Sequence, residues 1–282
     1  MLGVGLSHGG SACRSPSQSP QPQAGEETIG SAIDLRNSTA IVTGAARGLG
    51  EAIALALAQA GAAIGVLDVS DGAAAVSKIE DAGGRAKFLR CDIADFRQCR
   101  SCVMEFEKAL GPVAILVNNA ALYAELERQD FDAIDEEIWD AVMKVNITGV
   151  WNMCRAVGPT MRARRGGSII NISSSTARTG ALGMAHYVTS KAAVVGLTRA
   201  LARELGDSLV RVNTVSPTLI ANESSVNRKG FEGTSRRATS QQCFQRNATV
   251  DDITGTVVYL ASDLSAFVTG QTLAVDGGFD LL

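Results

Sequence analysis

Tyr187 and Lys191 are the pair of residues whose types and spacing best fit proton-transfer chemistry. They lie one helical turn apart on a helix predicted over Met184–Leu205, so their side chains share a face. A free phenol has a pKa of about 10, too high for a base near neutrality, but a neighbouring ammonium favours the phenolate. The pair could therefore take the proton of an alcohol hydroxyl. Alternatively, Tyr187 is an ordinary residue of an amphipathic helix.

A glycine-rich turn at residues 43–50 (TGAARGLG) could hold phosphate groups, because it lies between a predicted strand and a predicted helix. Gly44 permits a tight turn, Gly48 lets the backbone approach a pyrophosphate, and Gly50 lets the helix pack close to the sheet. The first amides of the helix, together with its dipole, favour an anion there. The pattern predicts a dinucleotide site, with a plain glycine-rich connection as the alternative.

Two charged residues bear on which dinucleotide binds. Asp68 ends the second predicted strand, where a carboxylate can accept hydrogen bonds from the adenosine ribose and repel a 2′-phosphate. Arg47 lies in the turn itself and could pair with a 2′-phosphate. Because Asp68 occupies the more decisive position, the sequence favours NAD over NADP.

Short apolar runs alternate with longer amphipathic stretches from Ser38 onward. Seven runs are predicted as buried strands: Thr39–Thr43, Ala63–Asp68, Ala86–Asp92, Ala114–Asn118, Ser168–Ser173, Arg211–Ser216 and Thr272–Asp276. Six stretches are predicted as helices: Leu49–Ala60, Ala73–Ala82, Asp95–Leu110, Glu136–Arg165, Met184–Leu205 and Thr249–Leu260. The alternation predicts a single α/β domain with a Rossmann-like, doubly wound parallel sheet of seven strands and helices on both faces.

Two segments depart from this rhythm. Residues 1–34 are rich in Gly, Ser, Pro and Gln, so we expect a disordered N-terminal extension before a catalytic domain over residues 35–282. Residues 218–248 are polar, and long irregular inserts of this kind often act as lids or binding loops. Basic side chains there could attract an anionic substrate, although such charges commonly form a solvated surface. They are Arg228, Lys229, Arg236, Arg237 and Arg246.

The ordered set of motifs over residues 35–282 resembles the short, single-domain branch of the short-chain dehydrogenase/reductase family. The turn has the spacing Thr-Gly-x-x-x-Gly-x-Gly, and Tyr187 with Lys191 matches Tyr-x-x-x-Lys. The other matching segments are residues 91–93 (CDI), 118–121 (NNAA), 145–146 (VN), 169–174 (IINISS), 212–217 (VNTVSP) and 269–278 (TGQTLAVDGG). Each motif is weak alone, but their order along the chain is specific.

The resemblance implies a role for each matched residue. Tyr187 is the general acid/base, Ser174 binds the substrate oxygen, and Lys191 also holds the nicotinamide ribose. Asn146 keeps a water in a proton relay, although the residue type alone also fits a satisfied buried amide. Cofactor contacts are implied for Gly44, Arg47, Gly48, Leu49, Gly50, Asp68, Asp92, Ile93, Asn119, Tyr187, Lys191, Pro217, Leu219 and Ile220. Ala121, Thr218 and Asn222 depart from the family pattern.

The substrate side is the part on which the sequence is least informative. Ser174, Tyr123 and His186 are candidate contacts. The favoured function is an NAD(H)-dependent oxidoreductase of a secondary alcohol or ketone, and the alternative is an NADPH-dependent carbonyl reductase of the 3-oxoacyl-carrier-protein reductase type. A non-catalytic NAD(P)-binding regulator is a third hypothesis, which the complete catalytic set disfavours. The resemblance also implies a homo-oligomer, a tetramer or dimer, in which residues 279–282 could take part.

Composition argues against several other classes of protein. The formal net charge is -3 with acids and bases mixed, which does not fit a nucleic-acid binder. We find no apolar run long enough for a membrane span and no signal-peptide layout, although a Ser-rich N-terminus leaves a mitochondrial transit segment as an alternative. Six scattered cysteines indicate reduced thiols in the cytoplasm. Two histidines and an isolated Cys99-x-x-Cys102 pair predict no metal site.

Overall fold

Seven apolar strands form a parallel sheet at the centre of the molecule. The computed structural model describes residues 33–227 and 230–281. The strands are β1 (Thr39–Thr43), β2 (Ala63–Asp68), β3 (Arg85–Arg90), β4 (Val113–Asn118), β5 (Gly167–Ile172), β6 (Val210–Pro217) and β7 (Thr272–Val275). Their order is β3-β2-β1-β4-β5-β6-β7, and every pairing is parallel. The order reverses beside β1, as in a doubly wound sheet.

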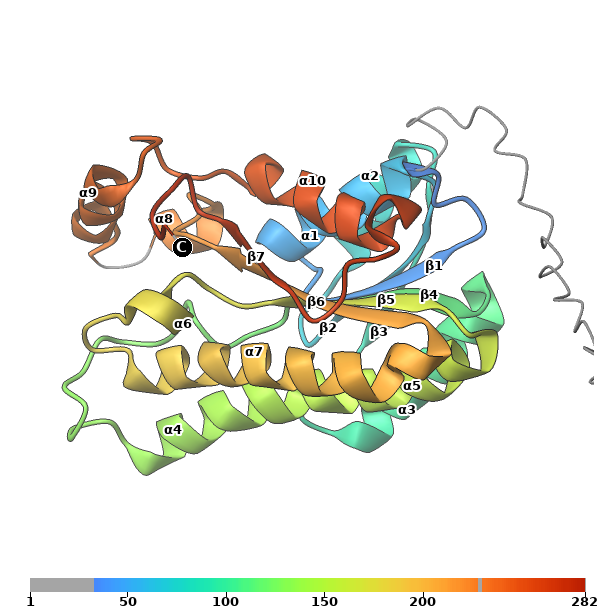
Figure 1. The fold of residues 1–282 in the computed structure, drawn as a ribbon, viewed down its shortest axis with the longest axis horizontal. Coiled ribbons are helices and arrows are strands. Elements are labelled where there is room, and N and C mark those ends of the chain that lie inside the picture. Colours follow the sequence, from blue (N-terminus) through green and yellow to red (C-terminus); the bar gives the residue numbers. More distant parts are fainter. Residues whose placement is uncertain (1–32, 228–229, 282) are drawn as a thin grey trace, which may run out of the picture.

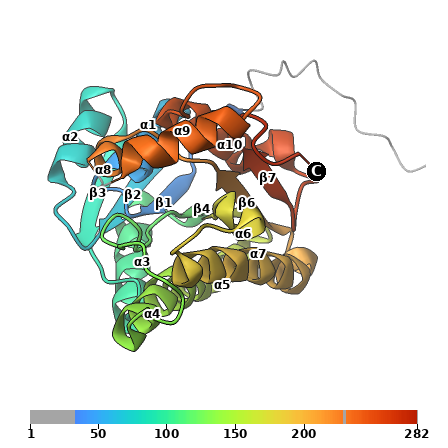
Figure 2. The same cartoon turned by 90° about the vertical axis from the view of Figure 1, so that its left-hand side faces the viewer.

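Helices cover both faces of the sheet, which explains why the strands are continuous apolar runs (Figure 1, Figure 2). One face carries α1 (Gly48–Gln59), α2 (Ala73–Asp81) and α10 (Val250–Ala261), and the other carries α3 (Phe96–Leu110), α5 (Val150–Arg164) and α7 (Ala185–Leu205). Along β1, Val42 packs with the first group of helices and Ile41 with the second. The predicted Rossmann-like α/β class of a single domain is therefore confirmed.

The helix predicted over Glu136–Arg165 is continuous but not uniform. It consists of α4 (Glu136–Met143), a π-helical segment η2 (Lys144–Gly149) and α5. A π-helix changes which backbone groups pair without changing the pattern of apolar residues strongly, so hydrophobic periodicity did not reveal it. The change occurs at the predicted site residue Asn146, and π-segments are frequent at functional sites.

The insert at residues 218–248 contains helices that the sequence pattern did not predict. They are α8 (Glu223–Val226) and α9 (Phe231–Gln241). No residue of α9 is buried, so the apolar repeat that marks a helix is missing from its sequence. The short α6 (Thr176–Thr179) was also not predicted, and two 3-10 turns, η3 (Gly206–Ser208) and η4 (Asp263–Ser265), complete the fold.

Two expectations concern parts of the chain at the limits of the described residues. The N-terminal extension over residues 1–34 falls almost wholly outside them, because the description begins at residue 33. Arg228 and Lys229 also lie outside. Within the described ranges, none of the helices combines the length and apolar character needed to cross a membrane.

Candidate active site

A cavity of about 1470 Å³ opens where the carboxyl ends of the strands meet. Ligands of doubly wound sheets bind at this edge, where the strand order reverses. The cavity wall contains every residue for which a cofactor contact was predicted. It is lined by Gly44, Arg47, Gly48, Leu49, Gly50, Asp68, Asp92, Ile93, Asn119, Tyr187, Lys191, Pro217, Leu219 and Ile220. The fold therefore brings these residues from six separate chain segments to one place.

The glycine-rich turn is closed by backbone contacts. Gly44 and Gly48 both have φ of 64°, a conformation that favours glycine. A Cβ on Gly44 would lie 2.8 Å from Ala120 Cα, and one on Gly50 would lie 2.0 Å from the Gly44 carbonyl oxygen. Gly50 is thus needed for closure of the turn itself, whereas the sequence had suggested helix-to-sheet packing. Asn119 Nδ2 braces the turn by donating to the carbonyl oxygens of Thr43 and Gly44 at 3.0 and 3.1 Å.

The first turn of α1 offers backbone amides to a bound anion. Arg47 is the N-cap residue, and no side-chain hydrogen bond caps the helix there. The N–H groups of a first turn have no partner within the helix, so they must find a ligand, a side chain or water. Because Gly48, Leu49 and Gly50 line the cavity, these amides fit the phosphates of a dinucleotide.

Asp68 lies at the end of β2 and is itself part of the turn's support. Its Oδ2 accepts from Ala46 N at 3.0 Å, and its Oδ1 accepts from Ser70 N at 2.9 Å. These two bonds fix the orientation of the carboxylate, which lines the cavity. Its remaining lone pairs can accept from ribose hydroxyls. Arg47 is exposed at the same wall.

Tyr187 and Lys191 lie on α7 and face the cavity together. Lys191 is buried, its Nζ donates to the Ile172 carbonyl oxygen at 2.7 Å, and Nζ lies 5.7 Å from the Tyr187 ring centroid. Burial lowers the pKa of Lys191 to about 8, so most of this lysine stays charged at neutral pH. The ammonium can therefore favour the phenolate of Tyr187. The Tyr123 ring packs on Tyr187 with centroids 4.8 Å apart.

Ser174 follows β5 at the point where the chain turns into α6. Its Oγ accepts from Thr176 N at 3.2 Å and lies 2.9 Å from Thr176 Oγ1. Its neighbour Ser173 donates its hydroxyl to the Lys191 carbonyl oxygen at 2.8 Å and thereby ties β5 to α7. Ser174 lines the cavity with Tyr187 and Lys191, so its hydroxyl could bind a substrate oxygen there.

Asn146 is fully buried behind the cavity wall in the π-helical segment η2. Its Oδ1 accepts from Leu122 N at 2.8 Å, and its Nδ2 donates to Leu122 O at 3.2 Å and Ser190 Oγ at 3.0 Å. The side-chain amide thus holds the loop after β4 against α7. Its proton-relay role stays a prediction, and these bonds show that the amide is already satisfied within the protein.

The two aromatic residues predicted beside the substrate have different positions. Tyr123 lines the cavity, but His186 does not. His186 is 1% exposed, and its Nδ1 accepts from Tyr187 N at 2.8 Å. Consecutive residues of an α-helix point about 100° apart, so His186 turns away from the cavity that Tyr187 faces. The structure therefore lends no support to the predicted contact of His186 with a substrate.

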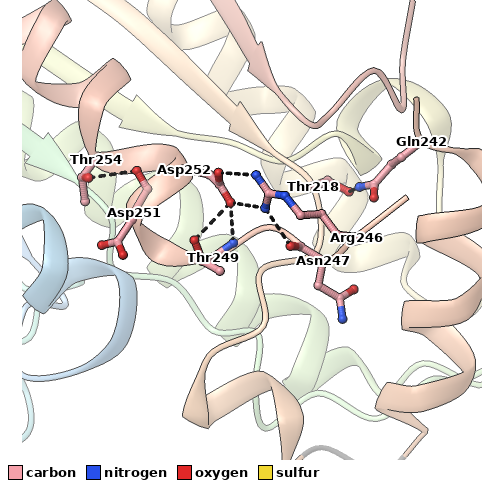
Figure 3. Close-up of polar contacts among 8 residues, drawn as sticks. All are labelled: Thr218, Gln242, Arg246, Asn247, Thr249, Asp251, Asp252 and Thr254. Carbon is pink, nitrogen blue, oxygen red and sulfur yellow. Dashed lines mark hydrogen bonds and ion pairs between the residues drawn. The ribbon is translucent and has the colours of Figure 1, made fainter. Parts of the chain in front are cut away.

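Polar contacts hold both ends of residues 218–248 on the sheet edge (Figure 3). Gln242 Nε2 donates to Thr218 Oγ1 at 3.0 Å, with both residues buried. Arg246 pairs with Asp252 at 2.6 Å, and Asp252 also forms the capping box of α10 with Thr249. Asn222 forms a second capping box, at α8. Two departures from the family pattern, Thr218 and Asn222, therefore serve to hold the insert.

Several cavity residues were missed by the sequence-based predictions. Thr234 and Gln241 come from α9, and Phe279 comes from the C-terminal segment. Arg237 of α9, which the sequence indicates only as one of five basic residues that could attract an anionic substrate, lines the cavity beside them. Phe279 had been considered only for assembly; its position is supported by an Arg178–Asp280 ion pair at 2.9 Å. The helical spacing of the α9 residues was visible in the sequence, but without an apolar face it carried no signal.

Comparisons with known proteins agree with this geometry. A family model described as enoyl-(acyl carrier protein) reductase matches residues 44–280. A probable galactose dehydrogenase of Rhizobium meliloti is 36% identical over 248 residues, which is 87% of this chain and 96% of that protein. A 3-oxoacyl-[acyl-carrier-protein] reductase of Staphylococcus epidermidis is 36% identical, over 86% of this chain and 98% of its own length.

A solved structure extends the similarity to three dimensions. A gluconate 5-dehydrogenase from Burkholderia cenocepacia, in complex with NADP and tartrate, superposes with a TM-score of 0.83 at 33% sequence identity. The match covers 89% of this chain and 98% of that chain. The likeness therefore includes the sheet, its helices and the edge at which the cavity lies.

Proposed function

The chain belongs to the short-chain dehydrogenase/reductase family and is an NAD(P)-dependent oxidoreductase of CH–OH groups; we propose that Tyr187 is its general acid/base. The observation that carries this proposal is a shared cavity. Ser174, Tyr187 and Lys191 line the same cavity as the glycine-rich turn. A reacting alcohol and a dinucleotide could therefore meet beside the phenol.

Each of these side chains contributes to the reaction through proton transfer or positioning. The dinucleotide, when bound, supplies the hydride acceptor or donor. Tyr187 takes the hydroxyl proton of the alcohol during oxidation and returns it during reduction. Lys191 favours the phenolate by its charge, and Ser174 donates a hydrogen bond to the substrate oxygen. Asn146 positions the loop before α4 against α7 through its bonds to Leu122 and Ser190.

We further propose that NAD is preferred over NADP. Asp68 supports this preference because its carboxylate is fixed at the end of β2 by two backbone amides and faces the cavity. A 2′-phosphate at that position would meet a negative charge. The exposed Arg47 at the same wall could offset part of this repulsion, so the preference is one of degree.

The test is a panel of secondary alcohols and ketones assayed with NAD(H) and NADP(H) in parallel, for wild type and Tyr187→Phe. We expect turnover by wild type and a loss of at least about 100-fold in the variant, because general acid–base catalysis contributes about that much or more. NADH binding, measured by fluorescence, should survive in Tyr187→Phe. Retained turnover in that variant would remove Tyr187 from the mechanism.

One specific observation favours the second candidate, an NADPH-dependent carbonyl reductase of the 3-oxoacyl-carrier-protein type. Arg47 lines the cavity, where its guanidinium could pair with a 2′-phosphate. The Staphylococcus epidermidis relative is named a 3-oxoacyl-[acyl-carrier-protein] reductase. A 3-oxoacyl thioester in the same panel distinguishes the two, since only this candidate predicts that the thioester with NADPH is the best pair.

We also propose a cytoplasmic homo-oligomer in which residues 218–248 shape the substrate end. Four of the described cysteines are buried and free, namely Cys91, Cys99, Cys102 and Cys154, as expected for a reducing compartment. Burial raises the pKa of Cys154 to about 12, so this thiol is inert. Exposed large apolar side chains such as Trp151 and Phe267 fit a subunit interface, which light scattering would test.

A further inference from the structure

Helix α9 turns one polar stripe toward the cavity. Thr234, Arg237, Ala238 and Gln241 line the cavity, and they recur every three or four positions, which places them on one side of a helix. Arg236 is also exposed but does not line the cavity. The stripe therefore offers one cation and two neutral hydrogen-bonding groups to whatever occupies this end of the cavity.

Arg237 differs from the other arginines around this end of the cavity. Arg246 pairs with Asp252, Arg178 pairs with Asp280, and Arg128 donates to the Leu182 carbonyl oxygen. The guanidinium of Arg237 makes no ion pair or hydrogen bond with any other residue that the structure describes. No described residue therefore takes up any of its five N–H donors.

The acidic groups of this end lie on a different wall. Glu125 and Asp130 line the cavity from the loop between β4 and α4, and both are exposed. Figure 1 shows that loop below the sheet edge and α9 above it. The α9 stripe contains no carboxylate, and Glu232, the acid in the first turn of α9, does not line the cavity.

We propose that the substrate is a secondary alcohol that also carries an oxyanion, a carboxylate or a phosphate, which pairs with Arg237. This inference rests on the proposed function, because the carbinol is held at Tyr187 and Ser174 while the oxyanion reaches α9. A guanidinium binds such groups with two parallel hydrogen bonds, which gives orientation as well as affinity. Thr234 and Gln241 can bond further hydroxyls of the same substrate.

The experiment compares matched substrates in wild type, Arg237→Gln and Arg236→Gln. The panel contains glucitol with gluconate and glucitol phosphate, and sec-butanol with β-hydroxybutyrate. For wild type we expect kcat/KM to favour the anionic member of a set by about 10- to 100-fold, the usual value of a charged hydrogen-bonded pair. The Arg237→Gln change should bring that ratio close to one, and Arg236→Gln, on the outer side of the same helix, should leave it unchanged.

The outcomes separate this inference from the function on which it rests. Wild type that oxidises neutral alcohols better than their anionic partners overturns the inference and leaves the oxidoreductase assignment intact. Equal ratios of kcat/KM for anionic over neutral substrates in Arg237→Gln and Arg236→Gln also overturn the inference. A wild type that oxidises no member with NAD or NADP contradicts the proposed function first. Preference for gluconate or for glucitol phosphate identifies which oxyanion is bound.

Discussion

The two walls of the active-site cavity are built by different means. The nucleotide wall, residues 44–50, 68–70 and 91–93, consists of short turns that directly follow β1, β2 and β3. A Cβ cannot be added at Gly44 or Gly50 without meeting backbone atoms. The wall that we propose for the substrate, called the substrate wall below, consists of the short helices α8 and α9 and the C-terminal segment over residues 276–281. It is held at its ends by the backbone pairing of Ile220 with Ala248, by a hydrogen bond from Phe244 N to Gly277 O, and by side-chain contacts such as Gln242 with Thr218.

This difference matches what each wall has to recognise. NAD and NADP share the same pyrophosphate, and backbone packed at atomic contact can fit that group with little tolerance. Substrates differ among relatives whose names specify galactose, a 3-oxoacyl group or gluconate. A wall attached by a few polar contacts can change its side chains without disturbing the sheet.

The largest effect is expected from Gly50→Ala in the nucleotide wall. If this variant were stable and bound NADH, the nucleotide wall would not be as rigid as we infer. The added Cβ would lie 2.0 Å from the Gly44 carbonyl oxygen, so we expect a loss of about 3 kcal/mol or more in unfolding free energy and loss of NADH binding. Urea unfolding and NADH fluorescence measure the two effects. Gly255→Ala in α10 is the control, since nothing lies within 4 Å of its Cβ, and it should be neutral or slightly stabilising.

Lys191 lies between the two walls, and its burial makes stability depend on pH. Its folded pKa of about 8 is below the ordinary 10.5, so the unfolded chain binds the proton more tightly. The destabilisation that results from burying the ammonium is fully present below pH 8. The unfolding free energy therefore rises by about 3 kcal/mol between about pH 8 and 10.5. The unfolding free energies of wild type and Lys191→Met can be measured in urea across that range, and their difference should show this rise. A flat difference would mean that the ammonium is not desolvated.

Asp68→Asn tests whether one side chain of the nucleotide wall sets cofactor choice. Removing the charge should shift the NADP-to-NAD ratio of kcat/KM by about tenfold toward NADP, a difference of about 1.4 kcal/mol. Asp71→Asn is the matched control, because Asp71 is a nearby exposed carboxylate that does not line the cavity. If both variants keep the wild-type ratio, the preference has another origin.

The smallest effects on stability are expected from changes at Arg246 and Asp252, the ion pair that joins the end of the insert to α10. Asp252 accepts from Arg246 and from Thr249 N, and these bonds, led by that from Arg246, hold its pKa below the usual range. Asp252→Ala should cost about 1 kcal/mol of unfolding free energy through loss of its half of the capping box, and Arg246→Gln about 0.5 kcal/mol. NADH affinity should not change in either. Because the Asp252 pKa is lowered, its contribution is present above about pH 4 and declines in acid, which thermal unfolding at several pH values can follow.

The sequence predicted one wall far better than the other, and particular residues show why. Gly44, Gly48, Gly50 and Asp68 were assigned to a dinucleotide site from a local pattern, strand, turn and helix. Arg237 was only one of five basic residues that could attract an anionic substrate, and Gln241 was not singled out, because α9 has no buried side chain and so no apolar repeat. His186, a candidate substrate contact from the sequence, does not line the cavity, because neighbouring helical residues point in different directions.

By itself the sequence determined the parallel α/β architecture, the turn that could hold a phosphate and the order of the motifs, because these depend on local periodicity and on where glycine is required. Only the tertiary structure decided that a π-helical segment fixes Asn146 away from the cavity, that Phe279 enters its wall and that Arg237 faces it without a partner among the described residues. Those features depend on contacts between segments far apart in the chain, and no local pattern of residue types encodes such contacts.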